Sequence, residues 1–327
     1  MKVLVTGAGG FLGRQVVRRL SARGHTVRAL VRRPDPALAS GDGGVEMVVA
    51  DLRSSPLAPS LGGVDAVVHA AAAMVGDDFT IFAGTVEGTE RLFEAIAQSP
   101  VRHLVLVSSF SVYDWLRVGE ALHGGSPLLA NPWLGGGYAA AKIWQERQAR
   151  RLAASTGIRL TVLRPGFIWS SDGALPACFG IPLGSMFCVI GPRRNPPLTH
   201  VVNCADAIAA AVGVSGAAVR TFDIVDRHGI SAWRWVGARL RREKRGSRFP
   251  LPGFLASTLV RAIDLASRLV FGPTRKLPSI CEPLRYAARF APIRVDSRTL
   301  ERELDWTPPL TSFSACLAAT ELRAPPG

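Results

Sequence analysis

The first 170 residues alternate short apolar runs with segments whose apolar positions recur at helical spacing. This alternation is typical of βαβ units, which assemble into a parallel sheet. Buried strands are expected at Met1–Val5, Thr26–Val31, Val45–Val49, Ala66–His69, Leu104–Val107 and Leu160–Leu163. Helices are expected between them at Phe11–Arg23, Glu87–Gln98 and Tyr138–Ser155. The pattern predicts an α/β fold, a Rossmann-type doubly wound parallel sheet.

After Pro165 the pattern changes, because glycine, proline and aromatic residues interrupt short elements. Helical periodicity returns in two later segments, Ala205–Val214 and Ser231–Arg242. We therefore expect a dinucleotide-binding Rossmann domain over residues 1–170, with its last strands completed by parts of residues 195–230. Residues 171–327 are expected to form mainly a smaller, interleaved C-terminal lobe that binds substrate.

Composition limits the class of protein. The chain has 327 residues, 48% hydrophobic and 20% charged, which is enough to bury a large core and excludes a disordered chain or a disulfide-stapled miniprotein. No stretch approaches the roughly 20 uncharged apolar residues that a membrane span requires. The chain starts directly in a strand-like segment rather than in a signal peptide. We therefore expect a soluble, cytoplasmic protein.

The five cysteines are odd in number and widely spaced, without a CxxC pair or clustered histidines nearby. Such spacing favours neither a metal site nor a disulfide framework. Reduced and mostly buried thiols are expected at Cys178, Cys188, Cys204, Cys281 and Cys316.

The net charge of +14 is unevenly distributed. Between Arg227 and Arg302 there are 17 basic and 5 acidic residues, so this stretch carries +12 of the total. The basic residues do not belong to a recognised nucleic-acid-binding module. We therefore expect them to be solvated, and we expect no nucleic-acid partner.

One segment within this basic stretch has an amphipathic helical pattern. Residues 254–271 carry apolar side chains at 255, 259, 263, 266 and 270, with Arg261, Asp264 and Arg268 opposite them. We expect the apolar face to pack on the C-terminal lobe, as a substrate lid or a core element. The alternative is that the helix lies on an anionic membrane and admits a lipid-like substrate.

The segment Thr6–Gly13 reads TGAGGFLG, and it lies between the first expected strand and the first expected helix. Glycines at 7, 10 and 13 permit a tight turn, a close approach of the backbone to a pyrophosphate, and close packing of helix on sheet. The phosphates would lie at the helix N-terminus. This context predicts a dinucleotide site.

The end of the second strand bears on which dinucleotide is bound. An acidic residue there binds the ribose hydroxyls of NAD, whereas this strand ends Val31-Arg32-Arg33-Pro34, without a carboxylate at its tip. Two guanidinium groups suit the 2′-phosphate of NADP. The residues favour NADP, with NAD possible; the alternative is that Arg32 and Arg33 are a solvated strand end.

Tyr138 and Lys142 form a YxxxK pattern on an expected helix. Residues four apart share a helix face, so the Lys142 ammonium can lie near the Tyr138 hydroxyl and a bound nicotinamide ribose. We expect the ammonium to lower the pKa of the phenol towards neutrality. A phenol with a pKa near 10 is otherwise a poor proton donor or acceptor at neutral pH.

Ser108 and Ser109 follow the strand Leu104–Val107. Ligands in open α/β sheets bind beyond the carboxyl ends of the strands, so a hydroxyl here can hydrogen-bond a substrate carbonyl. A serine pair at a strand end can also be simple turn chemistry. The presence of Tyr138 and Lys142 favours the functional interpretation.

These motifs, in this order, resemble the extended short-chain dehydrogenase/reductase superfamily, which includes the NAD-dependent epimerases/dehydratases and the 3β-hydroxysteroid dehydrogenase and dihydroflavonol reductase groups. The resemblance covers nearly the whole chain. Further matches are Asp51-Leu52, VVHAAA at Val67–Ala72, SSFSVY at Ser108–Tyr113, Arg164-Pro165-Gly166, HVVNCADA at His200–Ala207 and ELDWTP at Glu303–Pro308.

The resemblance implies roles for individual residues. Tyr138 would be the general acid/base, Lys142 its pKa modulator and a ribose ligand, and Ser109 the hydroxyl that orients the carbonyl. Ser109 is preferred to Ser108 because it lies three residues before the Val112-Tyr113 pair. The residues expected to contact the cofactor are Gly7, Gly10, Phe11, Leu12, Gly13, Arg32, Arg33, Asp51, Leu52, Ala70, Ala71, Ser108, Tyr138, Lys142 and Pro165.

Two departures from the family pattern narrow the reaction. Many relatives carry an asparagine where this chain has Thr85. Sugar-nucleotide 4,6-dehydratases place an Asp-Glu pair after the catalytic hydroxyl, where this chain has Phe110-Ser111. A 4,6-dehydratase is therefore not expected.

We expect an NAD(P)-dependent oxidoreductase that interconverts a ketone and a secondary alcohol on a small, fairly apolar substrate. This interpretation rests on the NADP preference and on Phe110, Phe167, Ile168, Trp169 and Asn203. The alternative within the superfamily is a nucleotide-sugar epimerase with retained NAD, and a non-catalytic dinucleotide-binding protein is a third possibility. The resemblance also implies a homodimer formed through helices of the dinucleotide domain.

Overall fold

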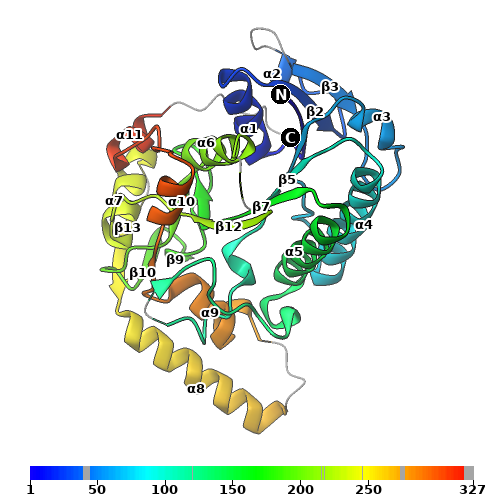
Figure 1. Ribbon diagram of the computed structural model, residues 1–327. Coiled ribbons are helices and arrows are strands. Elements are labelled where there is room, and N and C mark those ends of the chain that lie inside the picture. The colour runs from blue at the N-terminus through cyan, green and yellow to red at the C-terminus, as the bar shows by residue number, and fades with distance from the viewer. Residues whose placement is uncertain are drawn as a thin grey trace.

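The computed structural model describes residues 1–39, 45–119, 121–214, 216, 218–244, 246–272 and 277–319. A parallel sheet with strand order β12-β7-β5-β4-β1-β2-β3 forms its centre (Figure 1). The strands are β1 (Lys2–Thr6), β2 (Thr26–Val31), β3 (Val45–Val49), β4 (Ala66–His69), β5 (His103–Val107), β7 (Arg159–Pro165) and β12 (Val219–Ile224). The order reverses between β1 and β4, and in such sheets ligands bind beyond the carboxyl ends at this point. The expected doubly wound sheet is confirmed.

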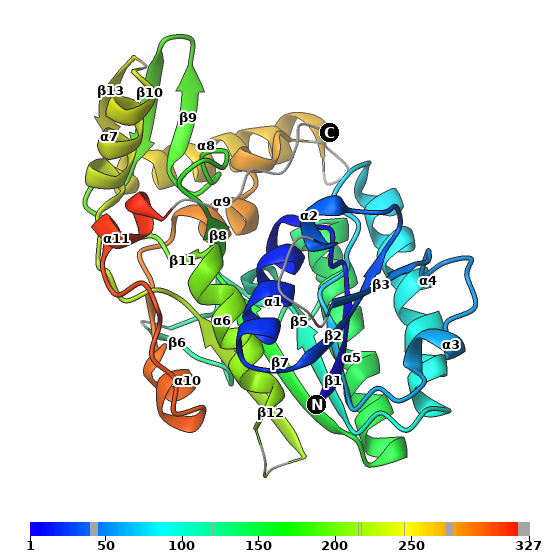
Figure 2. The ribbon, with the colours of Figure 1, turned by 90° about the horizontal axis from the view of Figure 1, so that it is seen from above.

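Both faces of the sheet are covered by helices (Figure 2). On one face α1 (Phe11–Ala22) and α6 (Val201–Val212) pack together, and on the other α4 (Asp78–Ala97) and α5 (Gly137–Thr156) do so. Strand β1 shows the consequence. Val3 and Val5 lie in the core that includes α1 and α6, whereas Leu4 lies in the core that includes α4 and α5. A strand buried on both faces reads as a continuous apolar run, which explains the pattern in the sequence.

Helix α4 begins nine residues before the expected Glu87. Its Asp77 cap accepts a hydrogen bond from the Thr80 amide at 2.7 Å. The added turns contain Ile81 and Gly84, which are poor helix formers, so propensity placed the start too late. Packing of α4 against α5 outweighs that weak propensity. Two short helices, α2 (Pro36–Ala39) and α3 (Ala58–Leu61), follow β2 and β3 respectively.

A C-terminal lobe lies beyond the carboxyl edge of the sheet and has three small sheets. They pair β13 (Ser247–Leu251) with β10 (Met186–Ile190) and β9 (Gly180–Leu183), β11 (Leu198–His200) with β8 (Phe167–Trp169), and β14 (Arg294–Val295) with β6 (Ala121–Leu122). The helices around them are α7 (Ala232–Glu243), α8 (Gly253–Phe271), α9 (Pro283–Phe290), α10 (Arg298–Glu303) and α11 (Phe313–Ala318). Short 3-10 helices are η1 (Phe110–Val112), η2 (Pro132–Gly135) and η3 (Ser279–Cys281).

Helix α8 projects along the edge of the molecule (Figure 1). The expectation that its residues 255, 259, 263, 266 and 270 pack on the lobe is wrong: four of them are exposed, and Ile263 alone is partly covered. The buried positions are instead Ala256, Val260, Asp264 and Ser267. Helix α8 lies mainly against α9 and η3, and its buried Ala256 and Val260 share a small core with residues of β10 and α9. Within the described residues, no helix is long and apolar enough to cross a membrane.

Candidate active site

The glycine-rich turn between β1 and α1 leaves no room for side chains at two positions. Gly7 has a φ of +70°, and a Cβ there would lie 2.9 Å from the Ala71 amide nitrogen. A Cβ on Gly13 would overlap the Gly7 carbonyl oxygen, which already accepts a hydrogen bond from the Gly10 amide at 3.0 Å. No side chain caps the start of α1. The amides of Phe11, Leu12 and Gly13 are therefore suited to the pyrophosphate of a dinucleotide.

The end of β2 holds a carboxylate that the sequence analysis missed. Arg32 and Arg33 are exposed, as a solvated or ligand-binding pair would be. Asp35 folds back over the turn, however, and its Oδ2 lies 3.6 Å from the position a Gly9 Cβ would take. Arg14 Nε donates to the same oxygen at 2.7 Å. The region thus has an acidic group, Asp35, whose charge is compensated by Arg14 of α1. In the sequence, the only sign of this carboxylate was its position four residues after the end of β2.

The ends of β3 and β4 border the same region. Hydrogen bonds from Arg53 hold the pKa of Asp51 below its ordinary value, and the positive charge of Arg32 adds to this effect. Leu52 is partly buried, and a Cβ on Gly88 would lie 3.1 Å from its side chain. Ala70 donates from its amide to the Thr6 carbonyl at 3.3 Å. Asp51, Leu52 and the Ala70-Ala71 backbone therefore line one continuous edge with the glycine turn.

Ser109, Tyr138 and Lys142 come together at the carboxyl end of β5. Ser109 lies just beyond this strand, and its side chain is hydrogen-bonded to that of Tyr138, in the first turn of α5. The Lys142 Nζ lies 5.8 Å from the centroid of the Tyr138 ring. It donates to the Val107 carbonyl at 2.8 Å. Three residues chosen from separate motifs thus share one site.

The pKa values in this site are set mainly by burial. Burial raises the pKa of Tyr138, and the Ser109 hydrogen bond lowers it by less. Burial lowers the pKa of Lys142 to about 8, against the opposite influence of Glu146. The expected lowering of the phenol pKa by Lys142 is therefore not found; the ammonium is bound to the Val107 carbonyl rather than to the phenol oxygen.

Ser108 points into a buried network behind the site. Its hydroxyl donates to Glu146 Oε1 at 2.5 Å, so it does not lie with Ser109 beside Tyr138. Arg164 binds both oxygens of Glu146, through Nε at 2.8 Å and Nη2 at 2.6 Å. Both charged side chains are 2% exposed. Glu146 lies one helical turn after Lys142 and so carries a charge next to the ammonium, a role that the i,i+4 spacing could have revealed.

The network continues to the far edge of the sheet. Arg164 Nη1 donates to the Tyr113 hydroxyl at 3.0 Å, and that hydroxyl donates to Asp223 Oδ1 at 2.5 Å. Burial raises the pKa of Asp223 to about 6, while the Tyr113 hydrogen bond opposes this. Pro165 follows Arg164 at the end of β7, so the RPG motif anchors β7 between β5 and β12.

A second buried network joins β1, β4, α4 and α5. The His69 ring lies 2.7 Å from Thr6 Oγ1 through Nδ1 and 3.0 Å from Thr89 Oγ1 through Nε2. Burial and the charge of Lys142 lower the pKa of His69 to about 3, so the imidazole is neutral. Thr85, at the position where relatives carry asparagine, accepts a hydrogen bond from the Ala73 amide at 2.9 Å. Its hydroxyl thus fixes the loop after β4.

Two aromatic residues that suggested an apolar substrate belong to hydrophobic cores. Phe110 is 4% exposed and its ring lies 5.7 Å from that of Tyr113. Trp169 is 3% exposed and its ring lies 5.3 Å from that of Trp235. Phe167 and Ile168 are partly exposed. Large aromatic side chains at the ends of strands fill the space between sheet and lobe, which the sequence could not distinguish from a substrate wall.

One cluster brings together three groups able to bind a metal, although the cysteine spacing gave no sign of it. Asp226, His228 and Cys316 place their ligand atoms within 4.8 Å of one another. The Cys316 Sγ lies 3.2 Å from His228 Nε2, and Asp226 accepts hydrogen bonds from the His200 amide and from Asn203. These contacts connect α11 to β11 and α6. All five cysteines are free, and all but Cys281 are buried, as expected.

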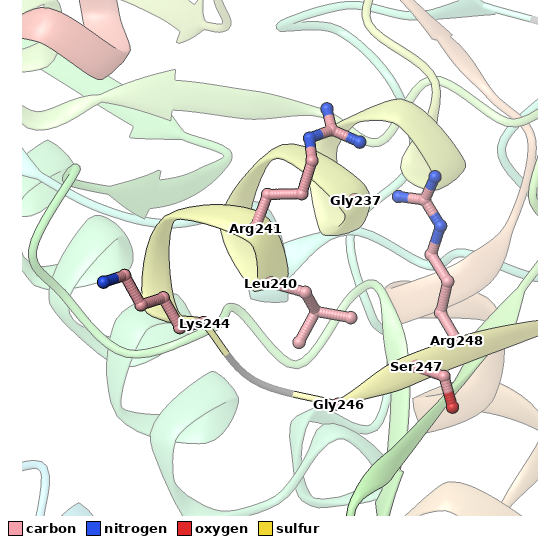
Figure 3. Close-up of a pocket in the computed structure, with 7 residues that line it drawn as sticks. All are labelled: Gly237, Leu240, Arg241, Lys244, Gly246, Ser247 and Arg248. Atoms are coloured by element: carbon pink, nitrogen blue, oxygen red, sulfur yellow. The ribbon is translucent and has the colours of Figure 1, made fainter.

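Two cavities lie in the C-terminal lobe. One, of about 460 Å³, lies beyond the carboxyl end of β12 and is bordered by Trp169, Leu198, Ile230, Ile293 and Phe313 together with charged residues. The other, of about 400 Å³, lies between α7 and β13, where Arg241, Lys244 and Arg248 line it (Figure 3). The first lies on the same side of the sheet as Ser109 and Tyr138, where ligands of such sheets bind.

Comparison with known proteins identifies the family of the chain. Residues 3–172 match the model of the NAD dependent epimerase/dehydratase family. A ketoreductase of Stigmatella aurantiaca named for 4-hydroxy-2-methyl-3-oxo-4-farnesyl-3,4-dihydroquinoline-1-oxide is 33% identical over 217 residues, 64% of each chain. A "3 beta-hydroxysteroid dehydrogenase/Delta 5-->4-isomerase" of Mycobacterium tuberculosis is 31% identical over 181 residues, 52% of this chain and 48% of that protein. The chain thus aligns with less than two thirds of the length of these relatives.

The fold is shared with solved structures of lower identity. A UDP-glucuronic acid 4-epimerase from Bacillus cereus in complex with NAD has a TM-score of 0.71 at 16% identity, over 97% of this chain and 96% of that chain. At this identity the likeness concerns the fold alone. The match of the family model over more than half of the chain, with the glycine turn and the Ser109–Tyr138–Lys142 site inside it, shows that the chain belongs to the NAD dependent epimerase/dehydratase family.

Proposed function

We propose that this protein is an NAD(P)-dependent oxidoreductase of the extended short-chain dehydrogenase/reductase type, which interconverts a ketone and a secondary alcohol on a small, fairly apolar substrate. One observation carries the proposal. Ser109, Tyr138 and Lys142 meet at the carboxyl end of β5, while the glycine turn opens at the same edge of the sheet, two strands away at β1. A hydroxyl pair beside a dinucleotide cradle is suited to hydride transfer coupled to proton transfer.

The residues divide the chemistry between them. A bound nicotinamide supplies or accepts the hydride. The Ser109 hydroxyl would hydrogen-bond the substrate oxygen and hold it next to Tyr138. In reduction, Tyr138 would donate its hydroxyl proton to that oxygen, and in oxidation it would take the proton back. Because burial raises the pKa of Tyr138, the phenol holds its proton at neutral pH, which suits the direction of reduction.

Lys142 would bind the nicotinamide ribose, with its positive charge 5.8 Å from the centroid of the Tyr138 ring. Its Nζ is held by the Val107 carbonyl, and Glu146 favours its charged form from one turn further along α5. Glu146 is itself fixed by Arg164. The Glu146–Arg164 ion pair thus keeps a negative charge next to Lys142, while burial lowers the pKa of Lys142.

We propose NADP as the preferred dinucleotide. Arg32 and Arg33 are exposed at the end of β2, where a 2′-phosphate would lie, and guanidinium groups bind phosphates bidentately. Asp35 is an acidic group beside the glycine turn that could oppose this choice, and its ion pair with Arg14 at 2.7 Å compensates its charge. The family is described as NAD dependent and the structural neighbour from Bacillus cereus binds NAD, so the preference for NADP is a property proposed for this chain.

A fairly apolar substrate is supported by the relatives rather than by Phe110 or Trp169. The Stigmatella ketoreductase is named for a farnesylated quinoline, and the Mycobacterium enzyme for a steroid. The cavity beyond β12 adds a suitable volume, and its walls combine apolar side chains such as Trp169 and Ile293 with charged ones.

The test is mass spectrometry of the purified protein for bound dinucleotide, followed by titration with NADPH and NADH. We expect little retained NAD, tighter binding of NADPH than of NADH, and NADPH-dependent reduction of hydrophobic ketones. Tightly retained NAD, with turnover of a nucleotide sugar and no net change in the dinucleotide, would contradict the proposal and support an epimerase.

A further inference from the structure

Helix α8 exposes a continuous apolar face. Its six large members are between 49% and 79% exposed, and we call them the α8 apolar face: Phe254, Leu255, Leu259, Leu265, Leu269 and Val270. At about 100° per residue, these positions and the intervening Thr258, Ala262 and Ala266 fill one arc of about 160° along the helix. A surface helix normally turns such an arc towards the core.

The inward side of α8 is the more polar one. Asp264 and Ser267 are buried there beside Ala256 and Val260. The Ser267 hydroxyl donates to the Asp264 carbonyl at 2.8 Å, and Asp264 forms an ion pair with Arg268 at 2.8 Å. The helix thus has its polar groups against the protein and its leucines outward, so the orientation is fixed by contacts on the inner side.

In the described part of the chain, nothing covers the α8 apolar face. The opposite side of the helix packs on α9, η3 and residues of β10, and the helix lies at the outer edge of the lobe (Figure 1). Contiguous exposed apolar surface of this kind marks a site of interaction. The shape is a single convex helix rather than a groove, which suits a flat, deformable partner.

The charge around the face indicates the chemistry of that partner. Arg261 and Arg268 are exposed beside one edge of the apolar arc. The methylene groups of a long arginine side chain can lie along an apolar surface while its guanidinium group reaches a polar one. The stretch from Arg227 to Arg302, which contains α8, carries +12. A second copy of this chain would bring two strongly basic surfaces together, whereas an anionic surface would neutralise them.

We propose that α8 docks the protein on anionic lipid bilayers, with the α8 apolar face inserted among the lipids and Arg261 and Arg268 at the headgroups. The helix would lie in the plane of the interface, where amphipathic helices insert to a depth of roughly 5–10 Å. Binding would need no spanning segment. This proposal is independent of the oxidoreductase activity, because it rests only on the surface of α8.

The direct experiment is co-sedimentation of the full-length protein with phosphatidylcholine vesicles that contain or lack phosphatidylglycerol. We expect binding to the anionic vesicles at low salt, weaker binding at high salt, and little binding to phosphatidylcholine alone. Leu269→Glu should reduce binding by at least about tenfold, because it places a charge within the inserted face. The matched control is Leu116→Glu, which changes another exposed leucine, 61% exposed, far along the chain and should leave binding unchanged.

Two further variants separate the lipid contact from a structural effect. Arg261→Gln should weaken binding about fivefold, the effect of one positive charge near an anionic membrane. Leu265→Trp should give a fluorescence emission that shifts to the blue when anionic vesicles are added. Circular dichroism and thermal melting check that each variant is folded.

The proposal is overturned if the folded wild type does not sediment with anionic vesicles at low salt, or if Leu269→Glu binds as well as the wild type. It is also overturned if light scattering shows a lipid-free dimer that Leu269→Glu converts to a monomer and vesicle binding is absent. In that case a second copy of the chain covers the face.

Discussion

Helices α1 and α8 are both amphipathic, yet they turn opposite faces to the protein. In α1 the apolar positions Val16, Val17 and Leu20 are buried between the sheet and α6. In α8 the leucines face outward, and small or polar residues such as Ala256 and Asp264 face inward. The hydrophobic pattern locates an apolar face, but the size of the neighbouring surface decides whether the protein itself can cover it.

The largest expected contrast is in stability. Leu20→Ala should lower the free energy of unfolding by about 2–5 kcal/mol, because it leaves a cavity in a closed core. Leu269→Ala should change it by less than about 0.5 kcal/mol, because the side chain is 79% exposed. Chemical denaturation of both variants measures the difference. Equal losses would mean that the α8 leucines are covered by the protein after all.

Glycines on α1 and α7 should also differ in their tolerance of a side chain. Gly13→Ala should cost about 1–3 kcal/mol and weaken dinucleotide binding, because its Cβ meets the Gly7 carbonyl in a turn that cannot move. At Gly237, on α7, the nearest atoms to an added Cβ belong to the Arg248 guanidinium (Figure 3), which is the end of a flexible side chain and can swing away. Thermal melting and NADPH titration compare the two. A Gly13→Ala protein with wild-type affinity would refute the proposed cradle.

Titration of Lys142 should limit the reaction at alkaline pH. Its pKa of about 8 means that the ammonium is lost as the pH rises through 8, so kcat/KM for reduction should fall by about tenfold per unit above that value. The stability effect has the opposite sign: the unfolded chain binds more protons between about pH 8 and 10.5, so this group favours folding as the pH rises. A pH–rate profile with parallel melting curves separates the two. Lys142→Arg should remove the decline near pH 8.

The smallest effect is expected on dinucleotide preference, at the part of the cofactor site that would bind the adenosine. Arg14→Ala should release Asp35 from its ion pair and place an uncompensated negative charge near the 2′-phosphate. We expect the preference for NADPH over NADH to decrease by about five- to tenfold, which corresponds to about 1 kcal/mol. Arg18→Ala, on the same helix, is the control. An unchanged ratio of kcat/KM values would show that Asp35 does not face the cofactor.

The sequence was sufficient for the sheet and for much of the site. Strands buried on both faces, such as Ala66–His69, leave continuous apolar runs whose ends can be read to within one or two residues. Tyr138 and Lys142 lie within one helix, so their spacing already places them together. Ser109 could be added because the carboxyl ends of parallel strands share one edge.

Other features depend on contacts that no local pattern contains. Asp35 reaches the glycine turn because the chain folds back after Pro34, and Arg14 receives it from another element. Arg164 binds Glu146, which lies 18 residues earlier in the chain. In the sequence alone, neither residue can be distinguished from an exposed charged residue. The outward orientation of α8 likewise depends on how little surface α9 offers to it.

In the proposed reaction Tyr138 moves the proton, while the rest of the site binds the dinucleotide. The most direct measurement is single-turnover reduction of a hydrophobic ketone by the NADPH complex of Tyr138→Phe, beside its Kd for NADPH. The account predicts an unchanged Kd and a rate of hydride transfer reduced by about 10²–10⁴-fold. A Tyr138→Phe protein that reduces the ketone at the wild-type rate would contradict it.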